Sequence, residues 1–274
     1  MTLKVATGPV ALAAALLAAG TALGGVDIKT RTEGREGVSG RMRAQGNQLR
    51  MDTEAPPSGA GATSIVFDAS KNLLRIYRHE DKSYFEIDEK YAEQIGAQMA
   101  EARKKMEEQL ARMPPEQRAM MEKMMEGGAL PFPPSDESQK RPPLDAKPTG
   151  ETETVGGIPC TSYALTRGGE KKGDVCAASW NALEIEAADV VAVKKLGAFQ
   201  SKLSDSFGAS ITGGEQPFEL LERIDGFPLR TRRMGDGQVV STTYFEDITQ
   251  VDVPADTFAV PAGYTKKQMG QPGG

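Results

Sequence analysis

Histidine is almost absent from this sequence, and most acid–base and metal chemistry is absent with it. The one histidine, His79, lies in a predicted turn beside Glu80 and Asp81. A catalytic histidine needs a nucleophile or a carboxylate that the fold places beside it, so we interpret His79 as a solvated turn residue. The chain also lacks a G-x-S-x-G elbow, an H-E-x-x-H helix, a phosphate-binding loop and a dinucleotide fingerprint. We therefore expect a protein that is not an enzyme and needs no cofactor.

Long apolar runs are missing after the first two dozen residues. The chain opens with Lys4 and an alanine-rich apolar run from Val10 to Leu23, which ends among small residues. This run is typical of a secretory signal peptide and is shorter than the roughly 20 residues that a membrane helix needs. We predict a signal peptide over residues 1–24 and a soluble protein exported to the periplasm. A retained N-terminal anchor is the alternative.

Positive charge is in slight deficit, with 33 Lys and Arg against 38 Asp and Glu. A mildly acidic chain argues against nucleic acid as a partner, because phosphate binding needs a basic stripe. The densest basic cluster, Arg230, Arg232 and Arg233, alternates along a predicted strand. We interpret this cluster as a solvated face, with binding of an anionic partner as the alternative.

Cysteine occurs only twice, at Cys160 and Cys176, in a segment that we interpret as a β-hairpin. The predicted arms are residues 154–166 and 174–179. Folding the hairpin about Gly168 places the two cysteines opposite each other, where Cβ atoms lie roughly 4.5–5.5 Å apart, near the reach of a disulfide. Because an exported protein meets an oxidising compartment, we predict a Cys160–Cys176 disulfide rather than a nucleophilic thiol.

The N-terminal half changes character at Asp88. Residues 25–88 alternate short apolar runs with tight turns, which predicts the strands of an antiparallel meander. From Asp88, apolar residues recur at spacings of three and four, which predicts a long amphipathic helix in a helical insertion over residues 89–128. A proline-rich linker follows at residues 129–150. The helical stripe consists of Tyr91, Ile95, Met99, Ala102, Met106, Leu110 and Met113.

Methionine is the compositional excess, with 12 residues. Met99, Met106 and Met113 fall seven residues apart on the helical stripe. Thioethers are soft ligands that favour Cu(I), but methionine is also an adaptable residue for apolar packing. We favour packing, and a metal site at these three methionines is the alternative.

The C-terminal part, residues 151–267, combines strands with one more helix, and a disordered tail is expected at residues 268–274. The elements predicted after the hairpin are a helix over residues 186–207, strands over 217–224, 228–233 and 239–246, and a closing segment over 253–264. The helix carries an apolar stripe formed by Val193, Leu196, Phe199, Leu203 and Phe207. This stripe predicts a helix that packs against the sheet.

Four motifs in this part resemble those of a known family: ETVGGIPCTSY, GDV-x-AASW with Cys176 at the variable position, GFPLRTR and FAVPAGY. Together they resemble a family of exported bacterial proteins of unknown function. The resemblance covers most of the chain after the signal peptide and is strongest from Glu151 to Tyr264. It implies a fold similar to that of the periplasmic lipoprotein carriers LolA and LppX, a curved antiparallel half-barrel with helices over its concave face. It implies no catalytic residues.

We therefore predict an α+β fold, with one curved antiparallel sheet, a helix over its concave face and the long Met-rich helix inserted. A half-barrel that is covered on one face either fills its interior with its own side chains or holds an apolar ligand. The predicted function is that of a periplasmic binding or carrier protein for a lipid or a lipoprotein acyl chain, held by Trp180, Val193, Leu196, Phe199 and Leu203. The alternatives are a Met-rich metal-binding or envelope-stress protein and a structural domain that binds an envelope protein partner.

Overall fold

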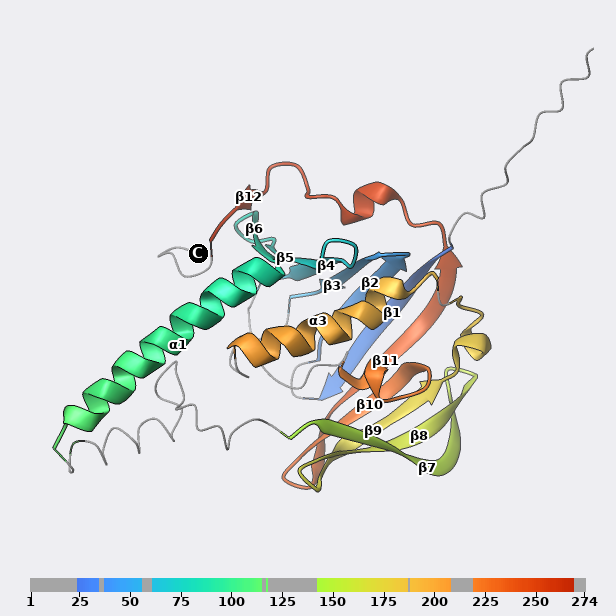
Figure 1. Cartoon of the computed structure of the whole chain (residues 1–274). Coiled ribbons are helices and arrows are strands. Elements are labelled where there is room, and N and C mark those ends of the chain that lie inside the picture. Colours follow the sequence, from blue (N-terminus) through green and yellow to red (C-terminus); the bar gives the residue numbers. More distant parts are fainter. Residues whose placement is uncertain are drawn as a thin grey trace, which may run out of the picture.

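The chain folds around one large sheet whose two halves come from opposite ends of the sequence (Figure 1). The computed structural model describes residues 24–34, 37–55, 61–114, 117, 142–186, 188–207 and 219–268. In this part of the chain twelve strands lie in the order β12-β6-β5-β4-β3-β2-β1-β11-β10-β9-β8-β7. They are β1 (Gly25–Gly34), β2 (Ser39–Gln45), β3 (Gln48–Thr53), β4 (Thr63–Asp68), β5 (Leu73–Arg78), β6 (Ser83–Ile87), β7 (Leu144–Val155), β8 (Ile158–Arg167), β9 (Glu170–Ala178), β10 (Phe227–Gly235), β11 (Gln238–Val251) and β12 (Thr265–Lys266). Strand β1 joins the halves, because it pairs with β2 on one side and β11 on the other.

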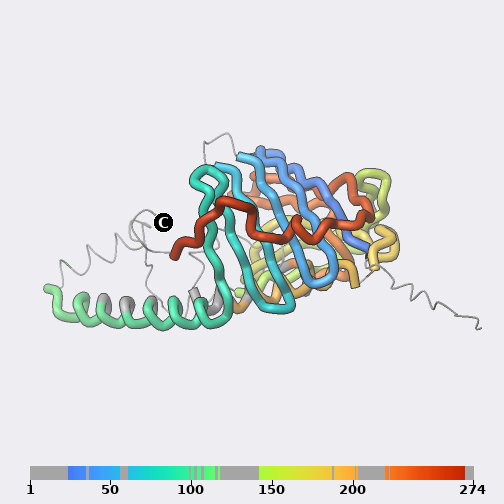
Figure 2. Tube along the Cα trace, turned by 90° about the horizontal axis from the view of Figure 1, so that it is seen from above, coloured from blue at the N-terminus to red at the C-terminus, as the bar shows by residue number. Residues whose placement is uncertain are grey.

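Helices cover the concave face of this sheet. The described helices are α1 (Glu89–Arg112) and α3 (Val191–Phe207), with short 3-10 turns η2 (Trp180–Leu183), η3 (Glu219–Glu222) and η4 (Ala255–Phe258). Helix α3 lies against β2, β3 and β4, and α1 contacts α3. Beyond that contact, α1 runs away from the sheet in both views (Figures 1 and 2). The predicted α+β class, a curved and unclosed antiparallel sheet with few helices, is confirmed.

The two faces of the sheet differ in polarity because side chains alternate along each strand. In β1, Val26 and Ile28 are buried in the main core beneath α3. The alternate residues Asp27, Lys29 and Arg31 form ion pairs with side chains of neighbouring strands. The face opposite α3 is therefore charged in its central part, whereas the face toward α3 is apolar.

The C-terminal segment covers another, apolar part of the face opposite α3. Val253 and Phe258 pack against buried Val66 and Tyr77 of β4 and β5, and Figure 2 shows this segment crossing the N-terminal strands. The segment ends in β12, which pairs with β6 in parallel. At the opposite edge, β7 carries Pro148 and a shift in its register with β8. A paired edge and a proline-bearing, irregular edge both discourage pairing with another chain.

A second, smaller core lies near the β7 end of the sheet. Leu220 and Ile224, in and after η3, pack with Leu144, Leu165 and Val175. The strand predicted over residues 217–224 is therefore wrong, since η3 occupies its centre. Leu220 and Ile224 are four residues apart, which places both on one side of a helical turn, and short apolar runs do not separate strand from helix by pattern alone.

The predicted hairpin arm over residues 154–166 is wrong in one respect. The chain turns at Gly156 and Gly157 and divides this arm between β7 and β8. Both glycines have positive φ, 59° and 83°, a conformation that glycine adopts without steric cost. The additional strand, β7, begins at Leu144 and so occupies the end of the predicted linker, residues 129–150.

The predicted helix over residues 186–207 is shorter than expected. Helix α3 begins at Val191, and η2 precedes it as a separate turn. Glu184 has a φ of 55°, a left-handed conformation that ends η2 before α3 can start. The strands predicted between residues 25 and 88 are present as β1 to β6.

Several predicted segments fall outside the described residues. These are the signal peptide (residues 1–24), the second helix of the insertion (116–125) and the tail (268–274), each apart from a single residue. None of the described helices combines the length and the apolar character that spanning a membrane requires.

Candidate functional site

Helix α3 lies against the concave face through the apolar stripe that its sequence predicts. Val193 and Leu196 are completely buried, and Phe199 is 4% exposed. The ring of Phe199 lies 5.2 Å from the ring of Phe67 in β4. The space beneath the first half of α3 is therefore filled by side chains of the chain itself. The side chain of Leu203 lies outside the described residues.

Polar contacts at both ends of α3 help to hold it in place. The backbone N–H of Ala192 donates to the carbonyl oxygen of Gly46 in the β2–β3 turn, at 3.0 Å. Toward the other end of the helix, Lys202 donates to Glu89 of α1 at 3.1 Å. The second contact is exposed and contributes little, since surface ion pairs are worth roughly 0–1 kcal/mol.

Trp180 lies in η2, the turn that precedes α3. It opens η2, whose first turn is capped by the Ser179 hydroxyl accepting from the N–H of Ala182 at 3.2 Å. The Trp180 ring lies 5.8 Å from the ring of Phe227, and Phe227 lies 5.2 Å from Phe245. The three rings form a series that runs from half-buried Trp180 into the main core.

A hollow of about 540 Å³ opens beside Trp180. It is lined by Trp180, Asn181, Glu184, Ile185 and Glu186. Ile185 belongs to the main core, while Glu184 and Glu186 are exposed and form no ion pair within the described part of the chain. The ammonium group of Lys194, one helical turn into α3, lies 5.0 Å from the centre of the Trp180 ring. The hollow thus combines an aromatic wall, an aliphatic base and two carboxylates.

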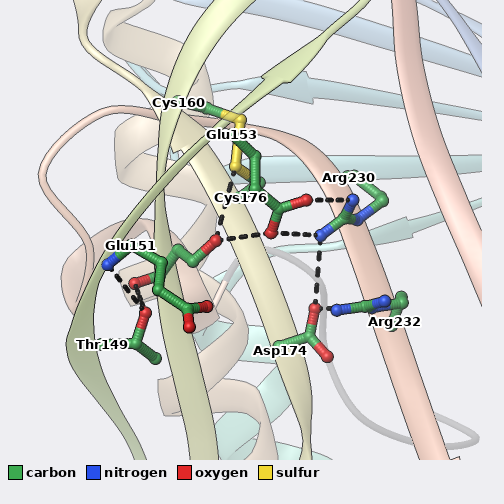
Figure 3. The surroundings of a disulfide bond; sticks show 9 residues. Thr149, Glu151, Glu153, Cys160, Asp174, Cys176, Arg230 and Arg232 are labelled. Carbon is green, nitrogen blue, oxygen red and sulfur yellow. Dashed lines mark hydrogen bonds and ion pairs between the residues drawn. A yellow bond between two sulfur atoms is a disulfide. The ribbon is translucent and has the colours of Figure 1, made fainter.

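The predicted disulfide joins β8 to β9 (Figure 3). The Cα atoms of Cys160 and Cys176 are 5.4 Å apart, and both residues are buried. The two cysteines are not directly opposed, however, because Cys176 pairs with Ser162. The turn is centred between Gly168 and Gly169, since Arg167 pairs with Glu170, and a register shift between Leu165 and Thr166 moves β9 one residue further along β8. The disulfide therefore connects a diagonal pair of positions.

Beside the disulfide, Arg230 lies in a cluster of charges (Figure 3). Its guanidinium donates to both carboxylate oxygens of Glu153, at 2.7 and 2.9 Å, and approaches Asp174 at 3.6 Å. The Arg230 side chain is 13% exposed, so the prediction of a solvated basic face is wrong at this residue. The acids that enclose it come from other strands. Hydrogen bonds from Arg230 and Ser162 lower the pKa of Glu153 to about 2.

His79 is half-buried and hydrogen-bonded on both sides, so its prediction as a solvated turn residue is also wrong. Its Nε2 lies 2.6 Å from the hydroxyl of Ser64, and its Nδ1 lies 2.5 Å from the hydroxyl of Tyr264. Ser64 donates to the Asp52 carboxylate at 2.5 Å. The Ser64 oxygen therefore accepts from Nε2–H, and Nδ1 accepts from Tyr264. Because Ser64 is completely buried, it cannot reach a substrate as a nucleophile.

The three methionines of the helical stripe, Met99, Met106 and Met113, are only partly described. The side chains of Met99 and Met106 lie outside the described residues, and Met113 follows the end of α1 as a half-buried residue. Among the described residues, no group of three or more His, Cys, Asp or Glu side chains could hold a metal ion. Copper binding by the three methionines stays a prediction.

The sequence matches a family that is described as a domain of unknown function, DUF4412, over residues 135–264. This range contains all four motifs that carry the resemblance to a family of exported proteins, Phe258 to Tyr264 included. No curated protein matches the sequence.

Solved structures of MucB show a weak likeness to the chain. In the complex of MucA and MucB from Pseudomonas aeruginosa, the matched chain is 12% identical, with a TM-score of 0.35, and the alignment covers 88% of this chain and 56% of that one. MucB alone is 11% identical, with a TM-score of 0.35 and coverage of 88% and 58%. The chain thus spans little more than half the length of these proteins. At these scores, likeness to the lipoprotein carriers stays a prediction, and the proposed function rests on this chain's own residues.

Proposed function

We propose that this protein is an exported, non-enzymatic binding protein that carries a lipophilic ligand, a lipid or an acyl chain, between α3 and the concave face of the sheet. The observation that supports this most is the series of rings Trp180, Phe227 and Phe245. It leads from the hollow at the entrance of α3 into the main core. An apolar chain that enters there meets the Trp180 ring first and the rings of Phe227 and Phe245 once α3 has moved.

Binding requires α3 to move, because its stripe fills the interior. Burial of a Leu, Val or Phe side chain stabilises the closed state by roughly 1.5–3 kcal/mol, and Val193, Leu196 and Phe199 are all buried. A ligand opens the helix only by as much as its own contacts favour the open state. An acyl chain meets this condition, since it replaces side-chain contacts with contacts of the same apolar kind.

Trp180 is the only tryptophan of the chain, so its fluorescence reports on this site alone. Single-chain amphiphiles with a dodecyl tail, added below their micellar concentrations, are expected to shift or quench this fluorescence saturably. Phe199→Asp is expected to abolish the response, because it places an unpaired charge in the apolar site. Val239→Asp is the matched control: it adds the same charge at an apolar residue that is 52% exposed, and the response is expected to persist.

Two results together would overturn the proposal. The first is a flat titration with every dodecyl amphiphile, in protein whose circular dichroism shows the native fold. The second is the absence of any lipid, by mass spectrometry, in an organic extract of protein purified from the cell envelope. The half-barrel would then be a structural domain with a permanently filled interior.

A second candidate function, docking of a protein partner, is favoured by α1. Every described side chain between residues 97 and 109 is exposed. Most helices in proteins gain their stability by packing one face against other elements and not from helix propensity alone. A partner that packs on this part of α1 is expected to slow its amide hydrogen exchange when envelope proteins are added. Unchanged exchange in residues 97–112 would exclude this function.

A further inference from the structure

The hollow beside Trp180 has the chemistry of a cation site, and we infer that the ligand carries a positively charged ammonium head beside its apolar tail. This inference rests on the proposed function, because it assigns a ligand class to the same site. The hollow measures about 540 Å³ and is open to solvent, which leaves room for a trimethylammonium group next to the Trp180 ring.

The first observation is a cation that already lies over the Trp180 ring, from a residue that does not itself line the hollow. The Lys194 ammonium is 5.0 Å from the centre of the Trp180 ring. Cations within about 6 Å of an aromatic centre are attracted by the negative ring face, and tryptophan is the strongest partner. Lys194 is exposed and Trp180 is half-buried, so the Lys194 ammonium can leave the ring for solvent. A ligand ammonium therefore competes with Lys194 for the same surface.

The second observation is a pair of carboxylates with no internal partner. Glu184 and Glu186 line the hollow and form no ion pair with the described residues. Most acids in the strands of the sheet form ion pairs instead, as Glu153 does with Arg230 and Asp247 with Lys29. Two unpaired carboxylates beside an aromatic face attract a cation and repel a fatty-acid carboxylate.

The third observation is that the backbone carrying these acids is held in place. The N–H of Glu184 donates to Asn181, and the N–H of Ile185 donates to Trp180, each at 3.2 Å. The Glu184 carbonyl accepts from the side-chain amide of Gln250 in β11. A site whose backbone is fixed before binding loses less conformational entropy when the ligand arrives. The acids thus stay at the rim of the hollow while α3 moves.

The test compares three probes with the same dodecyl tail: dodecyltrimethylammonium, dodecyl maltoside and dodecanoate. Trp180 fluorescence is expected to give the tightest Kd for the cation, roughly fivefold or more below that of the neutral probe, and the weakest for the anion. In the double variant Glu184→Gln and Glu186→Gln this order is expected to disappear. The matched control, Glu54→Gln with Glu151→Gln, removes two other exposed carboxylates and is expected to keep it.

Lys194→Met provides an independent variant. It removes the internal cation but keeps an unbranched apolar stem, and it is expected to tighten binding of dodecyltrimethylammonium by several-fold. A lysine with a purely structural role would produce no such gain. Weaker binding of the cation in this variant would contradict the inference.

The remaining outcomes separate the inference from the proposed function. Equal Kd values for all three dodecyl probes, or a cation preference that survives the double Gln variant, overturn the inference and leave the carrier proposal standing. No binding of any probe overturns the inference, and together with the absence of lipid in the organic extract it overturns the carrier proposal as well. Choline, which has the ammonium but no tail, is expected to bind far more weakly. Choline binding as tight as dodecyltrimethylammonium would support the cation site and overturn a lipophilic ligand.

Discussion

Cys176 lies directly opposite Ser162, yet its disulfide runs to Cys160, two positions away along β8. The Ser162 hydroxyl donates to Glu153 at 2.7 Å and lies 3.9 Å from the Cys176 sulfur. Glu153 in turn accepts from Arg230. One corner of the sheet, from β7 to β10, is thus braced by a covalent bond and by a hydrogen-bonded ion pair that share Ser162 as a neighbour.

The disulfide is expected to stabilise the fold measurably. Cys160→Ala with Cys176→Ala is expected to lower the free energy of unfolding by about 3 kcal/mol at most, the entropy of closing a short loop in the unfolded chain. Urea unfolding of both proteins measures this difference. Thiol titration of the denatured, unreduced wild type is expected to find no free thiol, and two reactive thiols per chain would contradict the disulfide in the exported protein.

Glu153 is expected to make stability depend on acid pH. Its pKa in the folded protein, about 2, lies below its ordinary value of 4.5 because Arg230 and Ser162 hydrogen-bond to the charged form. A lowered pKa means that the stabilisation is complete above about pH 4.5 and is lost as the pH falls toward 2. Glu153→Gln is expected to cost about 1 kcal/mol at neutral pH, a value reduced for the partial exposure of this carboxylate.

Urea midpoints measured from pH 7 to pH 2 check this expectation. The difference between wild type and Glu153→Gln is expected to shrink steadily below pH 4.5. Glu151→Gln, on the same strand but without an ion pair among the described residues, is the control and is expected to run parallel to the wild type. A constant difference for Glu153→Gln across this range would show that the pair carries no proton linkage.

The Tyr264 hydroxyl is expected to hold the C-terminal segment on the sheet. Tyr264→Phe removes the donor to His79 Nδ1 and is expected to cost about 1 kcal/mol, the usual net worth of a hydrogen bond. Amide exchange of Thr265 and Lys267, whose N–H groups donate to Lys82 and Tyr84, is expected to become faster.

Tyr163→Phe serves as the control for this change, because the Tyr163 hydroxyl has no hydrogen bond with the described residues. It is expected to leave both the stability and the exchange of β12 unchanged. If the two variants behave alike, the contact of Tyr264 with His79 does not hold the segment.

The methionine stripe is expected to serve packing or a partner rather than a metal. Changing Met99, Met106 and Met113 together to leucine keeps the volume and the apolar character of the stripe but removes its three thioethers. Helicity by circular dichroism is expected to be unchanged. Cu(I) binding, measured in competition with a chelator, is expected to be weak in both proteins. Tight binding that this variant alone abolishes would favour metal handling instead.

Elements that depend on near neighbours could be predicted from the sequence. The stripe through Val193, Leu196 and Phe199 predicted a helix packed on the sheet, because residues three and four apart share one face of a helix. The disulfide between Cys160 and Cys176 was predicted correctly, although the register assumed for the hairpin differs from the observed one. A hairpin keeps its arms adjacent whatever the bulge, and the diagonal positions remain within reach of a disulfide.

The contacts between segments that are distant in the sequence are known only from the folded chain. Arg230 reads as solvated in its own strand, and its partner Glu153 lies 77 residues earlier. His79 reads as an exposed turn residue, and Tyr264 lies 185 residues later. The first contact follows from the pairing of β10 with β9, which brings Arg230 beside β7 to β9, and the second from the pairing of β12 with β6. Local propensity carries no information on such pairings. Their free energy is the balance between the entropy lost in closing a long loop and the burial of side chains that are remote in sequence.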